Sequence, residues 1–370
     1  MNPNRLLSLD VFRGMTVALM IMVNNPGDWE HLYAPLEHAE WNGCTPTDLV
    51  FPFFLFIVGV SITYSLSGSL PSRDVIFKII TRSLKLFGLG LFLALFPKFN
   101  FETVRIMGVL QRIAVVYLLA SLLFLYLSPR QLIWAFCLIL LSYCALMTLV
   151  PVPGIGIANL APETNIGAWL DRLILGEAHL YKAAKVWDPE GLTSTLPALG
   201  TGISGVLVGL LLKHKTLDIK DKLLWLFTAG LALMAIGWAW DAAGFPINKK
   251  IWTSSYVCWT SGLGACFLAA LFWLVDLKGY RTWTKPFVIY GVNAITVFFL
   301  SGLIPRILGM IKITQADGET IGTQQYLYLN FIAPFFSSPY NASLAGAITC
   351  ISIWLGILWW MYNKKIFIKV

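Results

Sequence analysis

Charged residues are scarce in this sequence. Only 12% of the 370 residues are Asp, Glu, Lys or Arg, whereas 57% are hydrophobic and the mean hydropathy is +0.72. Soluble proteins contain about 25% charged residues, so this composition excludes an ordinary soluble protein. Apolar runs of about 20 residues, the length that crosses a bilayer, recur along the whole chain. We therefore predict an all-α, polytopic membrane helix bundle that forms a single domain, 1–370.

Cysteine pairs are also missing. The six cysteines include no C-x-x-C pair and mostly fall inside apolar segments, a pattern that indicates neither a zinc site nor a disulfide framework. We predict no metal. The net charge of +8 does not indicate a nucleic-acid partner, because the Lys and Arg residues lie in short runs between apolar segments, as they do in membrane proteins. The expected surroundings are a lipid bilayer.

Ten segments are long and apolar enough to span, and an even number places both termini on one side. Arg73, Arg130 and the basic stretches 213–222 and 278–285 lie in connections on that side, which the positive-inside preference identifies as cytoplasmic. Residues 324–338 are too short and too polar to span, and we predict an interfacial or re-entrant segment there. The ten predicted spans are 6–23, 48–67, 75–96, 106–127, 131–150, 195–212, 222–242, 253–275, 286–305 and 343–362.

The predicted non-cytoplasmic connection 24–47 contains no Lys or Arg, but it holds two of the four histidines, His31 and His38. Histidine exchanges protons near neutral pH and is the first candidate for a general base, and this argument does not rank the two. In the stretch "TPTD", Thr45 fits a helix N-cap and Asp48 the third helical position. His38 is therefore expected just before a helix.

Polar residues inside apolar spans are costly and indicate either a functional site or a structural contact. Asp10 and Arg13 are three residues apart on one helical face and are expected to form an ion pair, whether structural or functional. Arg82 lies in the third predicted span, where its side chain could instead reach the membrane boundary. Gln111, Arg112 and Asn293 lie within the fourth and ninth spans, where they either line a site or hydrogen-bond helices together.

Two further connections combine acids, amides and indoles. Asp188 and Glu190 come just before the sixth span, and the connection before the eighth contains Asp241, Asn248 and Trp252. Such side chains bind sugars through hydrogen bonds and ring stacking. The alternative is an interfacial belt of tryptophan, of which the chain has 15.

Six stretches together resemble the family of heparan-alpha-glucosaminide N-acetyltransferase. They run in order from residue 5 to about residue 300: "RLLSLDVFRG", "VNNPGDWEHLYAPLEHAEWNGCTPTDLVFPFFLFIVGVS", "RIMGVLQRIA", "WDPEGLTSTLPA", "PINKKIWTSSYV" and "YGVNAITVFF". The first stretch is also similar to the opening helix of the wider acyltransferase-3 group. The resemblance implies transfer of an acetyl group from cytoplasmic acetyl-CoA to the amine of a glucosamine-type sugar on the other side of the membrane.

The resemblance also implies roles for particular residues. The family's active-site histidine occurs in an "H-x-x-W-N-G" context, which matches His38 and not His31, and an asparagine at the end of the first helix matches Asn24. Glu37, Glu40 and Asp48 are the candidates to orient His38, and surface solvation is the alternative for the first two. We expect Trp41, Asn42 and the acids, amides and indole of the two further connections to bind the acceptor. Phosphates of acetyl-CoA would be bound by Arg13, Arg82, Arg281 and Lys285, and its pantetheine arm would pass Gln111, Arg112 and Asn293.

A chain of this length is similar to bacterial relatives that have no luminal domain. We therefore expect a protein of the bacterial inner membrane, a homodimer by resemblance, whose acceptor is a small amino sugar or a glucosamine-terminated glycan. The alternative function is a transporter or permease for an amino sugar such as N-acetylglucosamine, which would need no acetyl-CoA.

Overall fold

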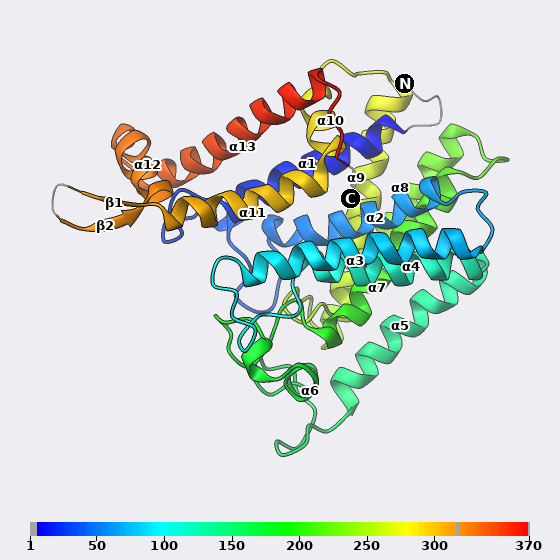
Figure 1. Ribbon diagram of the computed structural model, residues 1–370. Helices are drawn as coiled ribbons and strands as arrows, with labels where there is room; N and C mark the ends of the chain where they lie inside the picture. The colour runs from blue at the N-terminus through cyan, green and yellow to red at the C-terminus, as the bar shows by residue number, and fades with distance from the viewer. Residues whose placement is uncertain (1–5, 316–317, 369–370) are drawn as a thin grey trace.

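A computed structural model describes residues 6–315 and 318–368 of the protein. Its regular structure is almost entirely helical (Figure 1). The α-helices are α1 (Leu7–Asn24), α2 (Val50–Ser65), α3 (Arg73–Leu95), α4 (Val109–Tyr126), α5 (Pro129–Leu149), α6 (Ile166–Leu175), α7 (Leu192–Leu212), α8 (Ile219–Ala242), α9 (Ser254–Leu271), α10 (Lys285–Val292), α11 (Ala294–Met310), α12 (Thr323–Phe331) and α13 (Pro339–Asn363). Shorter elements are the 3₁₀ turns η1 (Ala34–Leu36), η2 (Pro46–Leu49), η3 (Glu177–His179) and η5 (Ala333–Phe335), the π-helical η4 (Phe272–Leu277) and the strands β1 (Lys312–Thr314) and β2 (Thr320–Gly322).

The predicted polytopic helix bundle is confirmed, and each of the ten predicted spans falls on a helix or a helix pair. Within the described residues, eight helices are long and apolar enough to cross a membrane, or nine if the bent pair α10–α11 is one span. Helix α3 is 23 residues long, but it is more charged, because it carries Lys78, Arg82 and Lys85. The main packing partners are α8 with α9, α2 with α7, α1 with α10, and α3 with α4.

Two glycines explain how the first helix meets a helix late in the chain. A Cβ atom on Gly14 of α1 would lie 1.7 Å from the carbonyl oxygen of Phe287 in α10. One on Gly291 would lie 2.6 Å from the carbonyl oxygen of Asp10. Small residues at such crossings let membrane helices gain close van der Waals contact. The crossing brings Asp10 and Arg13 beside the α10–α11 pair.

The ninth predicted span, 286–305, is not a single helix, because α10 and α11 are bent by 78° at Asn293. The Asn293 side chain does not tie two helices together. Its Oδ1 accepts a hydrogen bond from the backbone N–H of Ile368 (2.9 Å), and its Nδ2 donates to the carbonyl oxygen of Ile366 (3.2 Å). The segment after α13 therefore runs back to the helix break near the middle of the bundle (Figure 1).

Two regions contain structure that the sequence did not predict. The long connection 151–194 includes α6, whose N-cap Asn165 accepts a hydrogen bond from the backbone N–H of Ala168 (2.8 Å). The predicted interfacial segment 324–338 contains α12 and η5, and the antiparallel hairpin β1–β2 precedes it. Its position in an interface stays a prediction.

Four connections gather at one end of the bundle, which we call the His38 end. They are the residues between α1 and α2, α3 and α4, α5 and α7, and α8 and α9 (Figure 1). Backbone contacts join them, since the N–H of Gly43 donates to the carbonyl oxygen of Ile247 (2.7 Å) and that of Ile106 to His179 (3.1 Å). Side chains far apart in the sequence therefore meet at this end. The other end of the bundle is called the opposite end.

Candidate active site

His38 is held by a buried carboxylate at the His38 end. Its Nδ1 lies 2.6 Å from Oδ1 of Asp48. The imidazole is 42% exposed, whereas the Asp48 side chain is 1% exposed. A carboxylate at Nδ1 accepts a hydrogen bond from the N–H of that nitrogen, which leaves Nε2 as the basic atom of a neutral ring. The arrangement is that of a histidine base with an orienting partner.

Asp48 is fixed by the local sequence that the capping pattern identified. The predicted capping box is confirmed: the backbone N–H of Thr45 donates to Oδ2 of Asp48 at 3.0 Å, in a 3₁₀ turn that leads into α2. Oδ2 also accepts the backbone N–H of Ala39 (3.0 Å), and the Tyr256 hydroxyl donates to the carbonyl oxygen of Asp48 (2.5 Å). With its second oxygen occupied, Asp48 presents Oδ1 to His38.

A lysine from a distant loop completes this cluster. Nζ of Lys249, between α8 and α9, lies 3.0 Å from Nδ1 and 3.3 Å from Nε2 of His38, and 3.5 Å from Oδ1 of Asp48. Its side chain is only 13% exposed. Burial lowers the pKa of Lys249, while the carboxylates of Asp48 and Glu190 oppose that effect. The ion pair with Asp48 and the nearby charge of Glu190 are the reasons to treat Lys249 as an ammonium.

The predicted sugar-binding acids lie behind this lysine and pair with an arginine. Arg105 donates to both oxygens of Asp188, with its Nε 2.8 Å from Oδ2, and it also contacts Oε2 of Glu190. Burial alone would raise the pKa of Glu190, but Arg105, Arg112 and Lys249 hold that pKa below its ordinary value. Both carboxylates are buried. They position cations in this structure and are not open to a ligand.

Arg112 and Trp252 are also fully buried, with 0% exposure. The guanidinium lies 4.9 Å from the centre of the Trp252 indole and donates to the carbonyl oxygen of Gly191 (3.2 Å) and to Oγ of Ser194. The indole Nε1 donates to Oγ1 of Thr201 (3.2 Å). Nε and Nη1 of Arg112 are buried without a hydrogen-bond partner among the described residues, and the proposed roles of Arg112 and Trp252 in ligand binding stay predictions.

The remaining predicted acceptor residues hold loops together. Nδ2 of Asn248 donates to Oδ1 of Asn42 (3.0 Å), so these two amides join the connections on which His38 and Lys249 lie. Oδ1 of Asp241 accepts the backbone N–H of Ile247 (2.7 Å). The indole Nε1 of Trp41 donates to the carbonyl oxygen of Leu160 (3.0 Å). Asn42 and Trp41 remain partly exposed.

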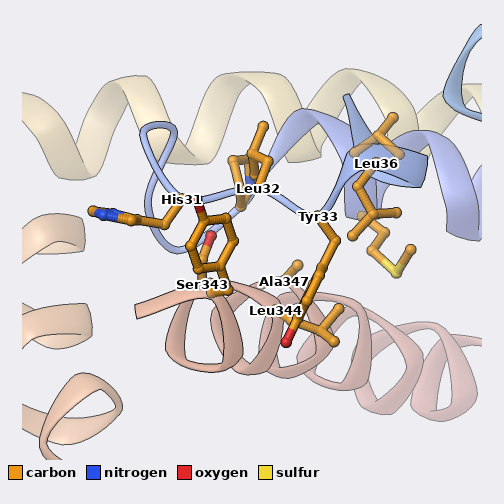
Figure 2. Close-up of a pocket in the computed structure, with 11 residues that line it drawn as sticks. His31, Leu32, Tyr33, Leu36, Ser343, Leu344 and Ala347 are labelled. Carbon is orange, nitrogen blue, oxygen red and sulfur yellow. The ribbon is translucent and has the colours of Figure 1, made fainter. Parts of the chain in front are cut away.

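The other loop histidine occupies a different environment. Nδ1 of His31 lies 2.7 Å from Oδ2 of Asp28, and its ring packs edge-on against Tyr340. Figure 2 shows a small cavity between this part of the loop and α13, with His31 at its edge and Tyr33 directed towards Leu344. His31 therefore belongs to the contact between the loop and α13, whereas His38 belongs to the cluster with Lys249.

Asn24 lines a large cavity at the His38 end. This cavity, which we call the Asn24 cavity, has a volume of about 740 Å³, and Gln111 and Arg105 also line it. Nδ2 of Asn24 donates to the carbonyl oxygen of Met20 (2.8 Å), which fixes the side chain at the end of α1. Trp29 and Tyr181 add aromatic surface. Lys182 and Arg306 line the cavity as well, so it combines amides, three cations and indole and phenol rings, which are groups that bind polar organic molecules.

Two cavities towards the opposite end share Arg13. The first, of about 430 Å³, is lined by Arg13 and Arg82 together with Ile368 and residues of the α10–α11 break, and we call it the Arg13 cavity. The second, of about 840 Å³, is lined by Arg13 and Lys213. The predicted ion pair of Asp10 with Arg13 is present at 3.0 Å. Arg82 lies 4.8 Å from the centre of the Tyr117 ring. Three cations therefore line two cavities that share Arg13.

Three residues predicted to bind acetyl-CoA have other contacts. Lys285 lies 4.7 Å from the centre of the Trp359 ring, and Arg281 donates to the carbonyl oxygen of Val275 (3.3 Å). Neither is among the described residues that line the cavities with Arg13. The Asn293 amide is occupied by the backbone of residues 366–368.

Comparison with known proteins relates the chain to a family. A family model described as heparan-alpha-glucosaminide N-acetyltransferase, catalytic, matches residues 5–168. The whole chain aligns with the human heparan-alpha-glucosaminide N-acetyltransferase at 31% identity and with the mouse protein at 30% identity. The chain is similar over its whole length to members of the heparan-alpha-glucosaminide N-acetyltransferase family. It covers 60% of the length of the human protein and 61% of the mouse protein.

The part of the chain that matches the heparan-alpha-glucosaminide N-acetyltransferase model contains His38, Asp48, Asn24, Arg13 and Arg82. Lys249 lies beyond it, and sequence reasoning did not select this residue. One signal was present, because two adjacent lysines in a connection predicted to be non-cytoplasmic depart from the positive-inside preference. Arg105 and Lys213 carried no comparable signal, and only the fold places them at a cavity.

Proposed function

We propose that this protein is a membrane-embedded acetyltransferase that moves an acetyl group from cytoplasmic acetyl-CoA to the amine of a glucosamine-type sugar on the non-cytoplasmic side. The observation that carries the proposal is the buried Asp48 on Nδ1 of His38. Similarity to the heparan-alpha-glucosaminide N-acetyltransferase family supports the reaction type. The His38 end is then the non-cytoplasmic end, and both termini are cytoplasmic.

The geometry of His38 suits proton removal from an amine. Asp48 accepts a hydrogen bond from Nδ1–H, so Nε2 is free to take a proton from the acceptor nitrogen as that nitrogen attacks the thioester carbonyl carbon. A carbon–nitrogen bond forms, the carbon–sulfur bond breaks, and the thiolate of CoA receives the proton that His38 removed. Asn24, fixed at the end of α1 by its bond to Met20, is proposed to orient the reacting carbonyl from the Asn24 cavity.

Acetyl-CoA would enter at the opposite end. Its phosphates need cations, which Arg13, Arg82 and Lys213 supply around the two cavities that share Arg13. The pantetheine arm would then pass from the Arg13 cavity towards Gln111 and the Asn24 cavity. Trp41 and Asn42 are the acceptor-side residues that remain partly exposed. We further propose a homodimer in a bacterial inner membrane, by analogy with the family.

The test is an assay of acetyl transfer from radiolabelled acetyl-CoA to glucosamine by purified protein. We expect His38→Ala to lower the rate by about 10²–10⁴-fold, the usual contribution of a positioned base. Acetyl-CoA should still raise its thermal stability, because a ligand that binds only the folded state stabilises it by mass action. His31→Ala is the matched control and should keep most of the activity, since His31 contacts Asp28 and α13 instead.

Three outcomes would contradict the proposal. Near-normal transfer by His38→Ala would exclude this histidine as the base. Loss of activity in His31→Ala but not in His38→Ala would show that His31, and not His38, is needed for the reaction. Stabilisation by N-acetylglucosamine with none by acetyl-CoA at saturating concentration would favour a sugar transporter.

A further inference from the structure

Asp48 creates a problem for a base. A carboxylate 2.6 Å from an imidazole stabilises the protonated ring through an ion pair. A histidine held only by Asp48 would therefore tend to keep its proton, and a protonated imidazole cannot accept one from an acceptor amine. The site needs a group that offsets the charge of Asp48 without displacing it from Nδ1.

Lys249 is placed to do this. Its Nζ is almost equidistant from both ring nitrogens of His38, at 3.0 and 3.3 Å, and 3.5 Å from Oδ1 of Asp48. An ammonium group against the ring opposes a second positive charge on that ring. At the same time it neutralises Asp48, which stays bound to His38 and to the backbone of Ala39 and Thr45.

The other groups around His38 do not replace this effect. Burial and the charge of Asp48 raise the pKa of Cys44 to about 12, so its thiol is neutral. The negative charge of Glu190 acts electrostatically on Lys249, and Glu190 is itself paired with Arg105. Glu37 and Glu40, on the His38 loop, are exposed, where water and salt screen their charges. Lys249 is therefore the cation in contact with His38 among the described residues.

The loop that carries Lys249 is built rigidly. The carbonyl oxygen of Asn248 accepts the backbone N–H of Thr253 (3.0 Å), and Oδ1 of Asn248 accepts that of Ile251 (3.1 Å). The bond between Asn248 and Asn42 connects this loop to the His38 loop. The lysine thus approaches the ring from a fixed backbone.

We propose that Lys249 is a positioning residue that keeps His38 unprotonated, and so able to act as a base, at neutral pH. This inference rests on the proposed function, in which His38 is the base. It assigns to the α8–α9 connection a direct part in setting the working pH of the enzyme.

The test compares the pH dependence of acetyl transfer in the wild type and in Lys249→Met. Removing the cation favours the protonated ring, so a higher pH is needed to deprotonate it. We expect the acidic limb of the rate profile to move about 1 pH unit upwards, with roughly a tenfold loss of rate on that limb and recovery at alkaline pH. The acceptor amine also titrates, but it does so identically for every variant.

Two variants control for charge and for position. Lys249→Arg keeps the cation and should restore the acidic limb towards that of the wild type. Lys250→Met removes the adjacent lysine, whose Nζ lies 5.9 Å from the centre of the Trp187 ring, and should leave the limb unchanged. If Lys249→Met does not fold, the double variant Lys249→Met with Glu190→Gln removes one charge of each sign and is measured in its place.

A second measurement does not depend on activity. Carbon-13 NMR of histidine labelled at Cε1 follows the titration of four histidines, and His38→Asn identifies the His38 signal. The midpoint of that signal should rise in Lys249→Met. An unchanged midpoint overturns this inference even if His38 is the base. If the midpoint rises in Lys249→Met but His38→Ala is fully active, the effect of Lys249 on the ring is supported. The proposed function, in which His38 is the base, is then wrong.

Discussion

The two ends of the bundle use their charges differently. At the His38 end, cations and carboxylates alternate through the protein: His38 and Lys249 contact Asp48, and Glu190 links Lys249 to Arg105. Towards the opposite end, Arg13, Arg82 and Lys213 line open cavities. The buried charges hold one another, while the cavity cations face space that a ligand can fill. The difference teaches that a charged residue in this membrane protein must be judged by what it faces.

The burial of charge explains this division. A buried ion pair is worth little by itself, but removal of one partner leaves an uncompensated charge that is strongly destabilising. The charges at the His38 end are therefore interdependent. Arg13 is also paired with the buried Asp10, but Arg82 lies at a cavity and against the Tyr117 ring, so replacing Arg82 mainly removes a ligand contact.

The largest expected effect comes from breaking the His38 cluster at its centre. Asp48→Asn cannot hold the Nδ1 proton as a carboxylate does and favours the wrong tautomer, so acetyl transfer should fall by about 10⁴-fold, as in other histidine–aspartate pairs. Asp28→Asn changes the matching pair with His31, which lies 2.7 Å away, and should leave the rate within a few-fold. If Asp48→Asn and Asp28→Asn lose equal activity in the radiolabel assay, the pair of His38 with Asp48 has no special role in the reaction.

A smaller effect is expected at the Arg13 cavity. Arg82→Ala removes a cation that is not part of the buried cluster, so the protein should remain stable while the Kd for acetyl-CoA rises about tenfold, the value of one charge-assisted contact. The loss should be smaller for dephospho-CoA if the missing contact is to a phosphate. Arg130→Ala, at an exposed position in the first turn of α5, is the control. If calorimetry shows the same loss of affinity for acetyl-CoA and for dephospho-CoA, Arg82 has a structural role instead.

The smallest effect concerns Asp171, a buried acid at the His38 end that Thr193 holds through two hydrogen bonds. Burial raises the pKa of Asp171 to about 6, so the folded state binds this proton more tightly than the unfolded state. The contribution of Asp171 to the free energy of unfolding is complete below the ordinary aspartate pKa and is lost as pH rises through about 6. Between pH 5 and 7.5 the loss is about 1 kcal/mol. Asp171→Asn should flatten this dependence in a denaturation series, and an unchanged slope would contradict the assignment.

Much of the fold could be predicted from the sequence because the bilayer imposes it. Helix length, apolar composition and the capping box at Thr45 are local properties, and each predicted span coincides with a helix or a helix pair. The break at Asn293 could not be predicted, because it depends on the return of residues 366–368. An asparagine inside an apolar run does not reveal its partner.

The candidate site was predictable only in part. His38 and Asp48 are ten residues apart and belong to one recognisable stretch, so their pairing could be expected. Lys249 is 211 residues from His38, and its role depends on which loops meet. Trp252 shows the converse, since an indole in a polar loop suggested sugar stacking, while the fold buries it under Arg112.

The contact between Asn293 and residues 366–368 also has a consequence for synthesis of the protein. Ile368 lines the Arg13 cavity, and its backbone bonds to the α10–α11 break. A ribosome makes residues 366–368 after every helix of the bundle, at about 5–20 residues per second. The wall of this cavity therefore cannot close while the nascent chain is still short of them. Helices already inserted in the bilayer must wait for residues 366–368 before this cavity is complete.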